Sequence, residues 1–432
     1  MQKYIYILLF ALICTVNIFA QDYWLRVPSP TTKQLMRCHL IDTIYGWACG
    51  EFGAIVHTSN SGANWVAQNS GITQFSIDDI FFINQRIGWA LANDYLFQGS
   101  IILRTTNGGQ NWTNSRYPDT SVVLNTVYFL DSLNGYFGCS FPGKIFKTTN
   151  AGANWNECTI DTQFCPILYI SPKNRFNFLN AQTGYACGGQ FDIQGMVWKT
   201  TDAGLNWVTY CVTAEPLFAI KVINSNKVIA TGGDFEYGSW TVQTHNSGSN
   251  WFYDSTTCGG IGRDLAFRTP SELWIPCTFS GKFALNLDSG SLSSPWYCIN
   301  TPDSIHPYAA DFVTPTYGWA FGNGGAILKY NTSVIGINEN QNQVPLKSAL
   351  FQNYPNPFNP TTTINYYIAQ ASPVKITVYD LLGKQMYVFV EDIKSAGFHK
   401  FNFNSFGLAS GVYFYKIEAG DYEESKKMVI LK

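Results

Sequence analysis

The sequence is poor in charged residues and in histidine. Lys, Arg, Asp and Glu make up 13% of its 432 residues, and there are 5 histidines. An average soluble protein has about 25% charged residues, so few charges remain to form a strongly polar surface. The formal net charge of −2 provides no positive field that would attract phosphates, which argues against nucleic acid as a partner.

The short motifs of common catalytic and metal sites are also missing. There is no Cys-x-x-Cys pair, no cluster of histidines, no Gly-x-Ser-x-Gly turn and no phosphate-binding loop. We therefore expect neither a metal nor a cofactor. The sequence has 11 cysteines, scattered singly, one of which (Cys14) lies in the N-terminal segment. In an exported chain these cysteines are open to two interpretations, disulfide bridges or small buried thiols.

Long apolar runs are absent after the first twenty residues. Lys3 is followed by an apolar run from Tyr4 to Val16, and Ala20 provides a small residue before a cleavage point. This run is shorter than the roughly 20 residues that span a bilayer, so it predicts a secretion signal over residues 1–20. The alternative is a buried N-terminal strand. With the signal removed, we expect no integral membrane segment.

What the sequence has instead is a repeated turn of the form Thr-x-Asn-x-Gly-x-x-Trp. The Asn or Asp is expected to bond to amides of its own turn, the Gly to accept positive φ, and the Trp to pack between sheets. The five copies have these Asn or Asp, Gly and Trp residues: Asn60, Gly62, Trp65; Asn107, Gly109, Trp112; Asn150, Gly152, Trp155; Asp202, Gly204, Trp207; Asn246, Gly248, Trp251.

A second repeat, Gly-Trp-Ala or Gly-Tyr, precedes each turn and recurs roughly every 45 residues. Helical periodicity is absent, and a period of this length with short alternating strands is typical of four-stranded propeller blades. Seven units fit residues 21–331, which predicts an all-β, seven-bladed β-propeller. The last unit has no Trp-bearing strand, and Trp24 lies in a segment that resembles one. We therefore expect residues 23–28 to complete the seventh blade and close the ring.

These turns resemble the Asp-box, or BNR, repeat of sialidases, sortilin-type receptors and proteins like the photosystem II stability/assembly factor. The pairing of Gly-Trp-Ala with the turn is most similar to the last group. The resemblance implies the propeller fold and no particular activity. In such propellers the Asp-box turns usually lie on the face opposite the ligand site.

The C-terminal part has a different composition. Residues 332–348 are polar and predict a linker, and residues 349–432 alternate as in a small immunoglobulin-like β-sandwich. Four motifs occur in order in this part, at residues 353–358, 380–384, 408–416 and 427–432. Together they resemble the type A C-terminal sorting domain of the type IX secretion system. The resemblance implies that the secretion machinery is a partner and that these residues act in sorting: Tyr354, Pro355, Asn356, Pro357, Phe358, Gly383, Gly411, Tyr413 and Lys432.

Three loops on the face away from the Asp-boxes combine acidic and aromatic residues. A glycosidase would need two carboxylates about 5 to 9.5 Å apart across a cleft, whereas rings and single carboxylates suit the binding of sugars or peptides. Ordinary solvated loops are the third interpretation. The candidate ligand-binding residues are Asp94, Tyr95, Phe97, Phe191, Asp192, Asp234, Phe235, Glu236 and Tyr237.

The sequence therefore predicts a non-catalytic propeller that is exported through the periplasm and is then secreted or held at the outer cell surface. Its ligand would be a protein or a polysaccharide. The alternative is a glycoside hydrolase of the xyloglucanase-like Asp-box type. A purely structural role in adhesion is a third possibility. A sialidase is disfavoured because no set of three converging arginines is evident.

Overall fold

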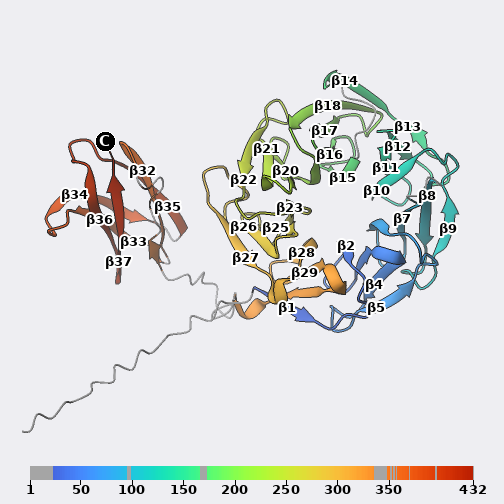
Figure 1. The fold of residues 1–432 in the computed structure, drawn as a ribbon, viewed down its shortest axis with the longest axis horizontal. Coiled ribbons are helices and arrows are strands. Elements are labelled where there is room, and N and C mark those ends of the chain that lie inside the picture. Colours follow the sequence, from blue (N-terminus) through green and yellow to red (C-terminus); the bar gives the residue numbers. More distant parts are fainter. Residues whose placement is uncertain are drawn as a thin grey trace, which may run out of the picture. The chain divides into compact units, whose positions relative to one another are not determined.

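The computed structural model describes residues 23–94, 99–165, 173–334, 348–350, 353, 356, 358–368, 370–394 and 397–431. The chain divides into two compact units, one ending at Thr332 and one beginning at Ser333. Both consist of β-strands and short turns (Figure 1). Within the described residues, no helix has the length and apolar character needed to cross a membrane.

The first unit contains seven sheets arranged around a central axis, the arrangement of a β-propeller (Figure 1). Each sheet has an inner strand near the axis and an outer strand at the rim. The first four sheets, which we number as blades 1 to 4, comprise the following strands: β2 (Leu35–Leu40), β3 (Gly46–Gly50), β4 (Ala54–Thr58) and β5 (Val66–Asn69); β6 (Ile77–Phe82), β7 (Gly88–Asp94), β8 (Gly99–Thr105) and β9 (Thr113–Arg116); β10 (Val123–Phe129), β11 (Gly135–Phe141), β12 (Ile145–Thr148) and β13 (Asn156–Glu157); β15 (Lys173–Phe178), β16 (Gly184–Gln190), β17 (Gln194–Thr200) and β18 (Asn206–Thr213), with β14 (Thr159–Phe164) added outside β18.

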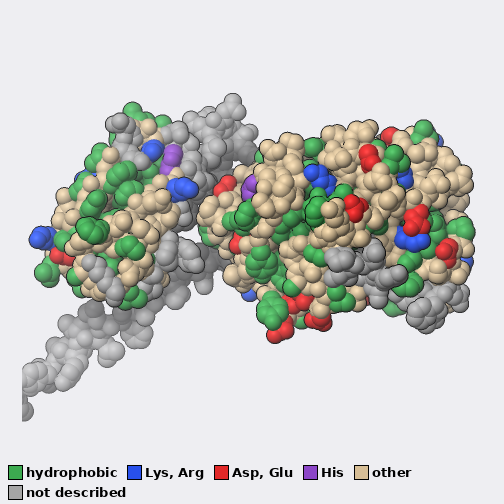
Figure 2. Space-filling model, turned by 90° about the horizontal axis from the view of Figure 1, so that it is seen from above, with side chains coloured by type: hydrophobic (Ala, Val, Ile, Leu, Met, Phe, Trp, Pro, Cys, Tyr) green, Lys and Arg blue, Asp and Glu red, His purple; other side chains and the backbone are tan. Residues whose placement is uncertain are grey.

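Blades 5 to 7 follow the same order, and blade 7 takes its outer strand from the beginning of the chain. Their strands are as follows: β19 (Leu217–Val222), β20 (Val228–Asp234), β21 (Gly238–Thr244) and β22 (Phe252–Ser255); β23 (Ile261–Gly262), β24 (Ala266–Phe267), β25 (Leu273–Thr278), β26 (Lys282–Asn286) and β27 (Trp296–Asn300); β28 (Pro307–Thr314), β29 (Tyr317–Gly322), β30 (Ile327–Tyr330) and β1 (Trp24–Val27). In the rim view of Figure 2, side chains of both charge signs lie scattered over the visible side of this unit.

The Gly-Trp-Ala repeat joins neighbouring blades. Trp89 of blade 2 stacks on Phe129 of blade 3 with ring centroids 3.7 Å apart, and Trp47 stacks on Phe82 in the same way at 3.6 Å. The glycine before the Trp is required because a Cβ at Gly88 would lie 2.5 Å from the ring of Phe82. The motif therefore combines a close approach within one blade with an aromatic contact to the next.

The Asp-box turns have the internal hydrogen bonds that the sequence predicts. In the first copy, the amide of Gly62 donates to Thr58 Oγ1 at 2.9 Å, and the amide of Asn64 donates to Asn60 Oδ1 at 3.0 Å. Gly62 has φ of 72°. Trp65 meets Trp319 of the adjacent blade at 5.4 Å, so the predicted packing between sheets is confirmed at this position.

Blade 6 has a sixth turn of this kind that the Thr-based pattern did not identify. Asn286 takes the place of the Thr, and its Oδ1 accepts the amides of Asp288 at 2.9 Å and Gly290 at 2.8 Å. Its Trp is Trp296, which follows Gly290 by six residues, whereas the Trp follows the Gly by three residues in the other copies. An amide oxygen thus performs the task of the hydroxyl, and three extra residues hide the spacing.

The ring closes where the sequence predicts. β1 pairs antiparallel with β30, and Trp24 lies opposite Tyr330. Trp24 is fully buried and contacts the rings of Trp274 at 5.7 Å and Phe283 at 4.9 Å. The N-terminal strand therefore pairs with an edge that would otherwise be open, and it adds an aromatic contact to blade 6.

Both interpretations of the cysteines hold, for different residues. Cys165 is bonded to Cys211 and Cys258 to Cys298. Each bridge ties the connection that enters a blade to the outer strand of that same blade. Among the described residues, the cysteines without a bridge are all buried: Cys38, Cys49, Cys139, Cys158, Cys187 and Cys277.

The second unit contains two sheets around a core of its own. The longest of its strands, β34, follows the turn at Asp380. The strands are β31 (Ala349–Leu350), β32 (Thr361–Ile368) and β35 (Gly397–Asn404) in one sheet, and β33 (Ser372–Tyr379), β34 (Gln385–Lys394), β36 (Gly411–Ala419) and β37 (Tyr422–Ile430) in the other.

Candidate functional site

The propeller has two faces with different kinds of turn. One carries the Asp-box turns. The other, which we call the loop face, carries the turns between second and third strands together with the connections between blades. These two sets of loops bond to each other: the amide of Gly53 donates to Phe75 O at 2.7 Å, and the amide of Thr301 donates to Gly281 O at 2.9 Å. The candidate ligand-binding residues that the structure describes all belong to the loop face.

The candidate loop of blade 2 lies partly outside the described residues. Tyr95 and Phe97 are not described, and of Asp94 only its place at the end of β7 is. Asn93, next to them, is buried and serves the fold: its Nδ2 donates to Asp78 Oδ2 at 2.7 Å and to Leu124 O at 2.6 Å.

In blade 4, Phe191 and Asp192 form the turn between β16 and β17. Asp192 has φ of 59° and an exposed side chain, and its amide donates to Glu215 Oε2 at 2.9 Å. Phe191 is exposed on one side and lies 5.8 Å from the ring of Phe218 on the inner strand of blade 5. The turn thus directs an aromatic ring towards the next blade, while Asp192 faces solvent.

In blade 5, Asp234 proves to be a structural residue. Its side chain is buried, and Oδ1 accepts the amides of Glu236 at 3.0 Å and Tyr237 at 2.5 Å. This Asx-type turn leaves Phe235 75% exposed and Tyr237 67% exposed. The carboxylate of Asp234 therefore stabilises the turn that exposes the side chains of Phe235 and Tyr237.

Four residues that the sequence analysis did not select complete this surface. Phe279, exposed in the turn after β25, lies 5.1 Å from Phe235 and 6.1 Å from Tyr308. Arg263 stacks on Phe218, with Cζ 4.1 Å from the ring centroid. The contacts form two groups, Phe191, Phe218 and Arg263 in one, of which Phe218 is buried, and Phe235, Phe279 and Tyr308 in the other. We call these six residues together the channel-mouth surface. It extends over blades 4 to 7.

Two of these residues, Phe218 and Tyr308, are the extra residues of β-bulges, because the inner strands of blades 5 and 7 shift register between Leu217 and Ala219 and between Pro307 and Ala309. The inner strands of blades 1 to 4 shift register at the corresponding place, so the bulge belongs to the repeat and re-aims the extra side chain in each of these blades. What distinguishes blades 5 and 7 is that the extra residue is aromatic.

The inner strands enclose a small cavity of about 160 Å³ lined by residues of every blade. Arg175 of blade 4 crosses it and bonds to Asp79 of blade 2 at 2.8 Å and to Asp264 of blade 6 at 3.5 Å. Burial acts to lower the pKa of Arg175, but the two carboxylates outweigh it and raise the pKa. This triad ties opposite sides of the ring together.

Near the central cavity, burial lowers the pKa of three further basic groups, those of His39, Arg263 and Arg37. Burial, followed by the charges of Arg175 and Lys221, lowers the pKa of His39 to about 4, so its ring is neutral at ordinary pH. Burial and the nearby Arg37 lower the pKa of Arg263 to about 10. Burial and the nearby Arg175 lower the pKa of Arg37.

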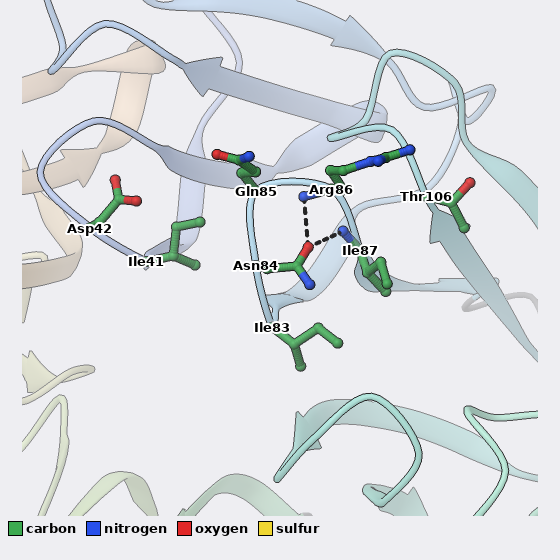
Figure 3. A pocket seen from close by; sticks show the side chains of 8 residues that line it. All are labelled: Ile41, Asp42, Ile83, Asn84, Gln85, Arg86, Ile87 and Thr106. Carbon is green, nitrogen blue, oxygen red and sulfur yellow. Dashed lines mark hydrogen bonds between the residues drawn. The ribbon is translucent and has the colours of Figure 1, made fainter.

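A wider hollow of about 580 Å³ lies on the Asp-box face between blades 1 and 2, lined by Ile41, Asp42, Ile83, Asn84, Gln85, Arg86, Ile87 and Thr106 (Figure 3). Its polar side chains mostly serve their own turns. Asn84 Oδ1 accepts the amides of Arg86 and Ile87, both at 2.9 Å, as Figure 3 shows. Asp42 Oδ1 accepts the amides of Ile44 and Tyr45, both at 2.7 Å. Asp42 and Asn84 therefore stabilise turns at the edge of the hollow, and this accounts for their presence there.

The sorting motifs meet at one end of the second unit. Asn356 Oδ1 accepts the amide of Val429 at 2.8 Å, and Phe358, which is buried, bridges to Ile430. Gly411 pairs with Ile430 at the start of β36. The predicted sorting residues Tyr354, Pro355, Pro357 and Lys432 lie outside the described residues.

The remaining sorting residues have structural surroundings of the same kind. Gly383 has φ of 77° in the turn that follows β33. Tyr413 is buried, and its hydroxyl donates to Ala409 O at 3.1 Å. Tyr379, the last residue of β33, pairs with Phe414 near the start of β36, so this turn lies at the same end as the other motifs.

Comparison with known proteins agrees with both units. Residues 16–331 match the model of the photosynthesis system II assembly factor YCF48. The chain belongs to the YCF48 family. Residues 352–431 match the secretion system C-terminal sorting domain, so this member of the YCF48 family carries an export signal at its C-terminal end. None of the curated proteins matches the chain.

Solved structures show the same fold at low identity. A YCF48 bound to D1 peptide is 20% identical with a TM-score of 0.57, covering 72% of this chain and 97% of that one. YCF48 from Cyanidioschyzon merolae is 18% identical with a TM-score of 0.56, covering 72% and 99%. The GH74 xyloglucanase from Xanthomonas campestris is 13% identical with a TM-score of 0.52, covering 80% of this chain and 59% of its own. Such identities establish the propeller fold and nothing of the activity.

Proposed function

We propose that this exported propeller is a non-catalytic binding protein that holds a polypeptide segment on its channel-mouth surface. The observation that carries the proposal is the set of aromatic residues that blades 4 to 7 place on the loop face, in which Phe235 is 75% and Phe279 45% exposed. Large exposed rings held on a rigid scaffold are costly in water and are typical of the central residues of binding surfaces.

Binding is favoured over catalysis by the state of the carboxylates. Asp234 is bonded to the amides of its own turn, and Asp192 faces solvent. A glycosidase needs two free carboxylates facing one another across the substrate. The likeness to a xyloglucanase concerns the fold alone.

A polypeptide ligand is favoured over a polysaccharide by the solved relative, which is a YCF48 bound to D1 peptide. In the present chain the ligand would be a different polypeptide, met outside the cytoplasm, since the sorting domain indicates export to the cell surface or secretion. Passage through the periplasm by the type IX machinery, with the sorting domain as the recognised part, belongs to the same proposal.

The binding proposal is tested with a displayed library of short peptides panned on the exported chain. Enriched peptides should lose at least about 10-fold in affinity on the double variant Phe235→Ala/Phe279→Ala, since central aromatic residues contribute more than about 1 kcal/mol each. The control is Phe252→Ala, because Phe252 is also exposed but begins the outer strand β22. Unchanged affinity in the double variant would overturn the proposed site.

Two further measurements complete the test. Release of reducing ends from xyloglucan by the purified protein, absent from a mock preparation, would overturn the non-catalytic part. For export, a chain that lacks residues 348–432 should remain in the periplasm. Normal surface display of that shortened chain would contradict the role given to the sorting domain.

A further inference from the structure

Resting on the proposed function, we infer that Arg263 and Arg37 form an anion site at the channel mouth that receives a carboxylate of the bound polypeptide. Neither guanidinium makes a hydrogen bond or ion pair within the described part of the chain, and the Nε atoms of both are buried without a partner. An arginine can donate five hydrogen bonds, so two unpaired guanidinium groups represent a large unused donor capacity.

Arg175, in contrast, is a largely buried arginine whose positive charge is balanced by ion pairs. It bonds to Asp79 and Asp264, which supply the negative charge that its burial requires. The groups whose charges act on Arg263 are only Arg37 and the hydroxyl of Tyr308, and no carboxylate is among them. Arg37 receives the distant influence of Asp79 and Asp264, but these two acids already bond to Arg175.

The charges around the mouth are therefore unequal. Arg37, Arg175 and Arg263 lie near two carboxylates, those of Asp79 and Asp264, and the cavity adds one further charge of each sign, Lys221 and Asp311. The positive charge of Arg37 acts unfavourably on Arg263. A buried cation without a counter-ion is unfavourable, so an external anion that binds Arg37 and Arg263 would supply the negative charge that the fold does not provide. Arginine also matches a carboxylate better than lysine does because its planar fork donates two parallel hydrogen bonds.

The surroundings of Arg263 fit a polypeptide carboxylate next to an apolar side chain. Its Cζ lies 4.1 Å from the ring centroid of Phe218, a cation–π contact that restrains the guanidinium group. Tyr308 is close enough to Arg263 for the two groups to interact electrostatically, and it lies 6.1 Å from Phe279 on the channel-mouth surface. A carboxylate on the two arginines would therefore place its neighbouring residue against aromatic rings.

The test compares three hexapeptides of the same apolar sequence, containing Phe. One has a free C-terminal carboxylate, one has an amidated end and an internal Asp, and one has an amidated end and Asn in place of Asp. Titration calorimetry on the exported chain should show that at least one acidic peptide binds about 10-fold or more tightly than the neutral one, since a hydrogen bond to a charged group contributes about 1.5–3 kcal/mol. The tighter of the two acidic peptides identifies the source of the carboxylate.

Arg263→Met should remove this preference and make acidic and neutral peptides bind alike. The matched control is Arg104→Met, because Arg104 also lies over an aromatic ring, Trp89 at 5.8 Å, but on the strand that leads into an Asp-box turn. That variant should keep the preference. A preference that survives in Arg263→Met, or equal binding of all three peptides to the native chain, would overturn the anion site.

Two outcomes separate this inference from the proposed function. If the peptides bind through Phe235 and Phe279 without any acidic preference, the binding surface stands and the anion site fails. If no peptide binds but sodium glucuronate does in an Arg263-dependent manner, the anion site stands and the polypeptide ligand is wrong. If Arg263→Met does not fold, sodium sulfate can be added to the native chain as a competing anion. It should lower the affinity of the acidic peptide and leave the affinity of the neutral peptide unchanged.

Discussion

The two faces of the propeller are built from turns of opposite character. On the Asp-box face, turns of nearly identical sequence use their polar groups on their own backbone, as Thr200 and Asp202 do. On the loop face the turns differ from blade to blade, and several expose a phenylalanine, as Phe52 and Phe141 do in blades 1 and 3. The recurring turns are thus internally satisfied, whereas the variable ones leave groups free for a ligand.

This difference indicates that a turn recurs in this chain where only a few sequences can form the required structure. A turn that must close at positive φ, bond to itself and place a Trp between sheets has few sequence solutions, so it recurs. A turn that only has to connect two strands can vary in sequence, and it can therefore carry binding residues. Four substitutions test this division, and they are given in order of decreasing expected effect.

The largest effect is expected for an Asp-box tryptophan. Trp207 is fully buried, and its Nε1 donates to Gly204 O at 3.1 Å. Trp207→Ala should lower the free energy of unfolding by about 3–5 kcal/mol, because it opens a cavity between blades that cannot collapse. Urea unfolding followed by circular dichroism measures the loss. A change below about 1 kcal/mol would show that the repeat is not the main support of the fold.

The next largest loss of stability is expected when a disulfide bridge of the loop face is removed. Cys258 and Cys298 are separated by 40 residues, and closing a loop of that length stabilises the folded chain by about 3–4 kcal/mol. The variant Cys258→Ser/Cys298→Ser should lose about this amount in non-reducing urea titrations. Faster amide exchange is expected in the connection before β23. The control is the buried thiol variant Cys38→Ala, which breaks no bridge. Equal stability of the disulfide variant and the native chain would contradict the role of the bridge.

Much of the fold follows from the sequence, since Gly88, Trp89 and the Asp-box turns impose local geometry that is visible in the residues themselves. The strand that closes the ring was predictable from Trp24 because it repeats the pattern of an outer strand. The sixth turn was not, because Asn286 replaces the expected Thr and the Trp is displaced by three residues.

The candidate site was predictable only in part. Phe235 and Tyr237 were selected as an acid–aromatic loop, but Asp234 turned out to hold the turn. Phe218 and Arg263 come from two neighbouring blades, and the packing of blade 5 against blade 6 brings Cζ of Arg263 within 4.1 Å of the Phe218 ring centroid. Contacts between distant segments leave no local signal, so a single sequence does not reveal them.

A smaller effect is expected for the hydroxyl that organises an Asp-box turn. Thr200 Oγ1 accepts the amide of Gly204 at 2.9 Å and donates to Asp202 Oδ1 at 2.9 Å. Thr200→Val should cost about 2 kcal/mol of unfolding free energy, because it leaves a buried amide unpaired. The control lies in the same blade: Thr209 is equally buried, but its hydroxyl has no partner in the described part of the chain. Thr209→Val should be neutral or slightly stabilising, and an equal loss in both variants would contradict the assigned role of Thr200.

The smallest effect on stability, and the sharpest test of the division, is expected at Phe235. Its side chain is exposed and contacts Phe279 at 5.1 Å on the outside of the turn. Because little apolar surface is buried there, Phe235→Ala should change the free energy of unfolding by less than about 0.5 kcal/mol. The same variant should weaken the binding of library-derived peptides several-fold in calorimetric titration, since the exposed ring is the part offered to a ligand. A marked loss of stability would mean that the turns of the loop face also serve the fold, and that the two faces differ less than their sequences imply.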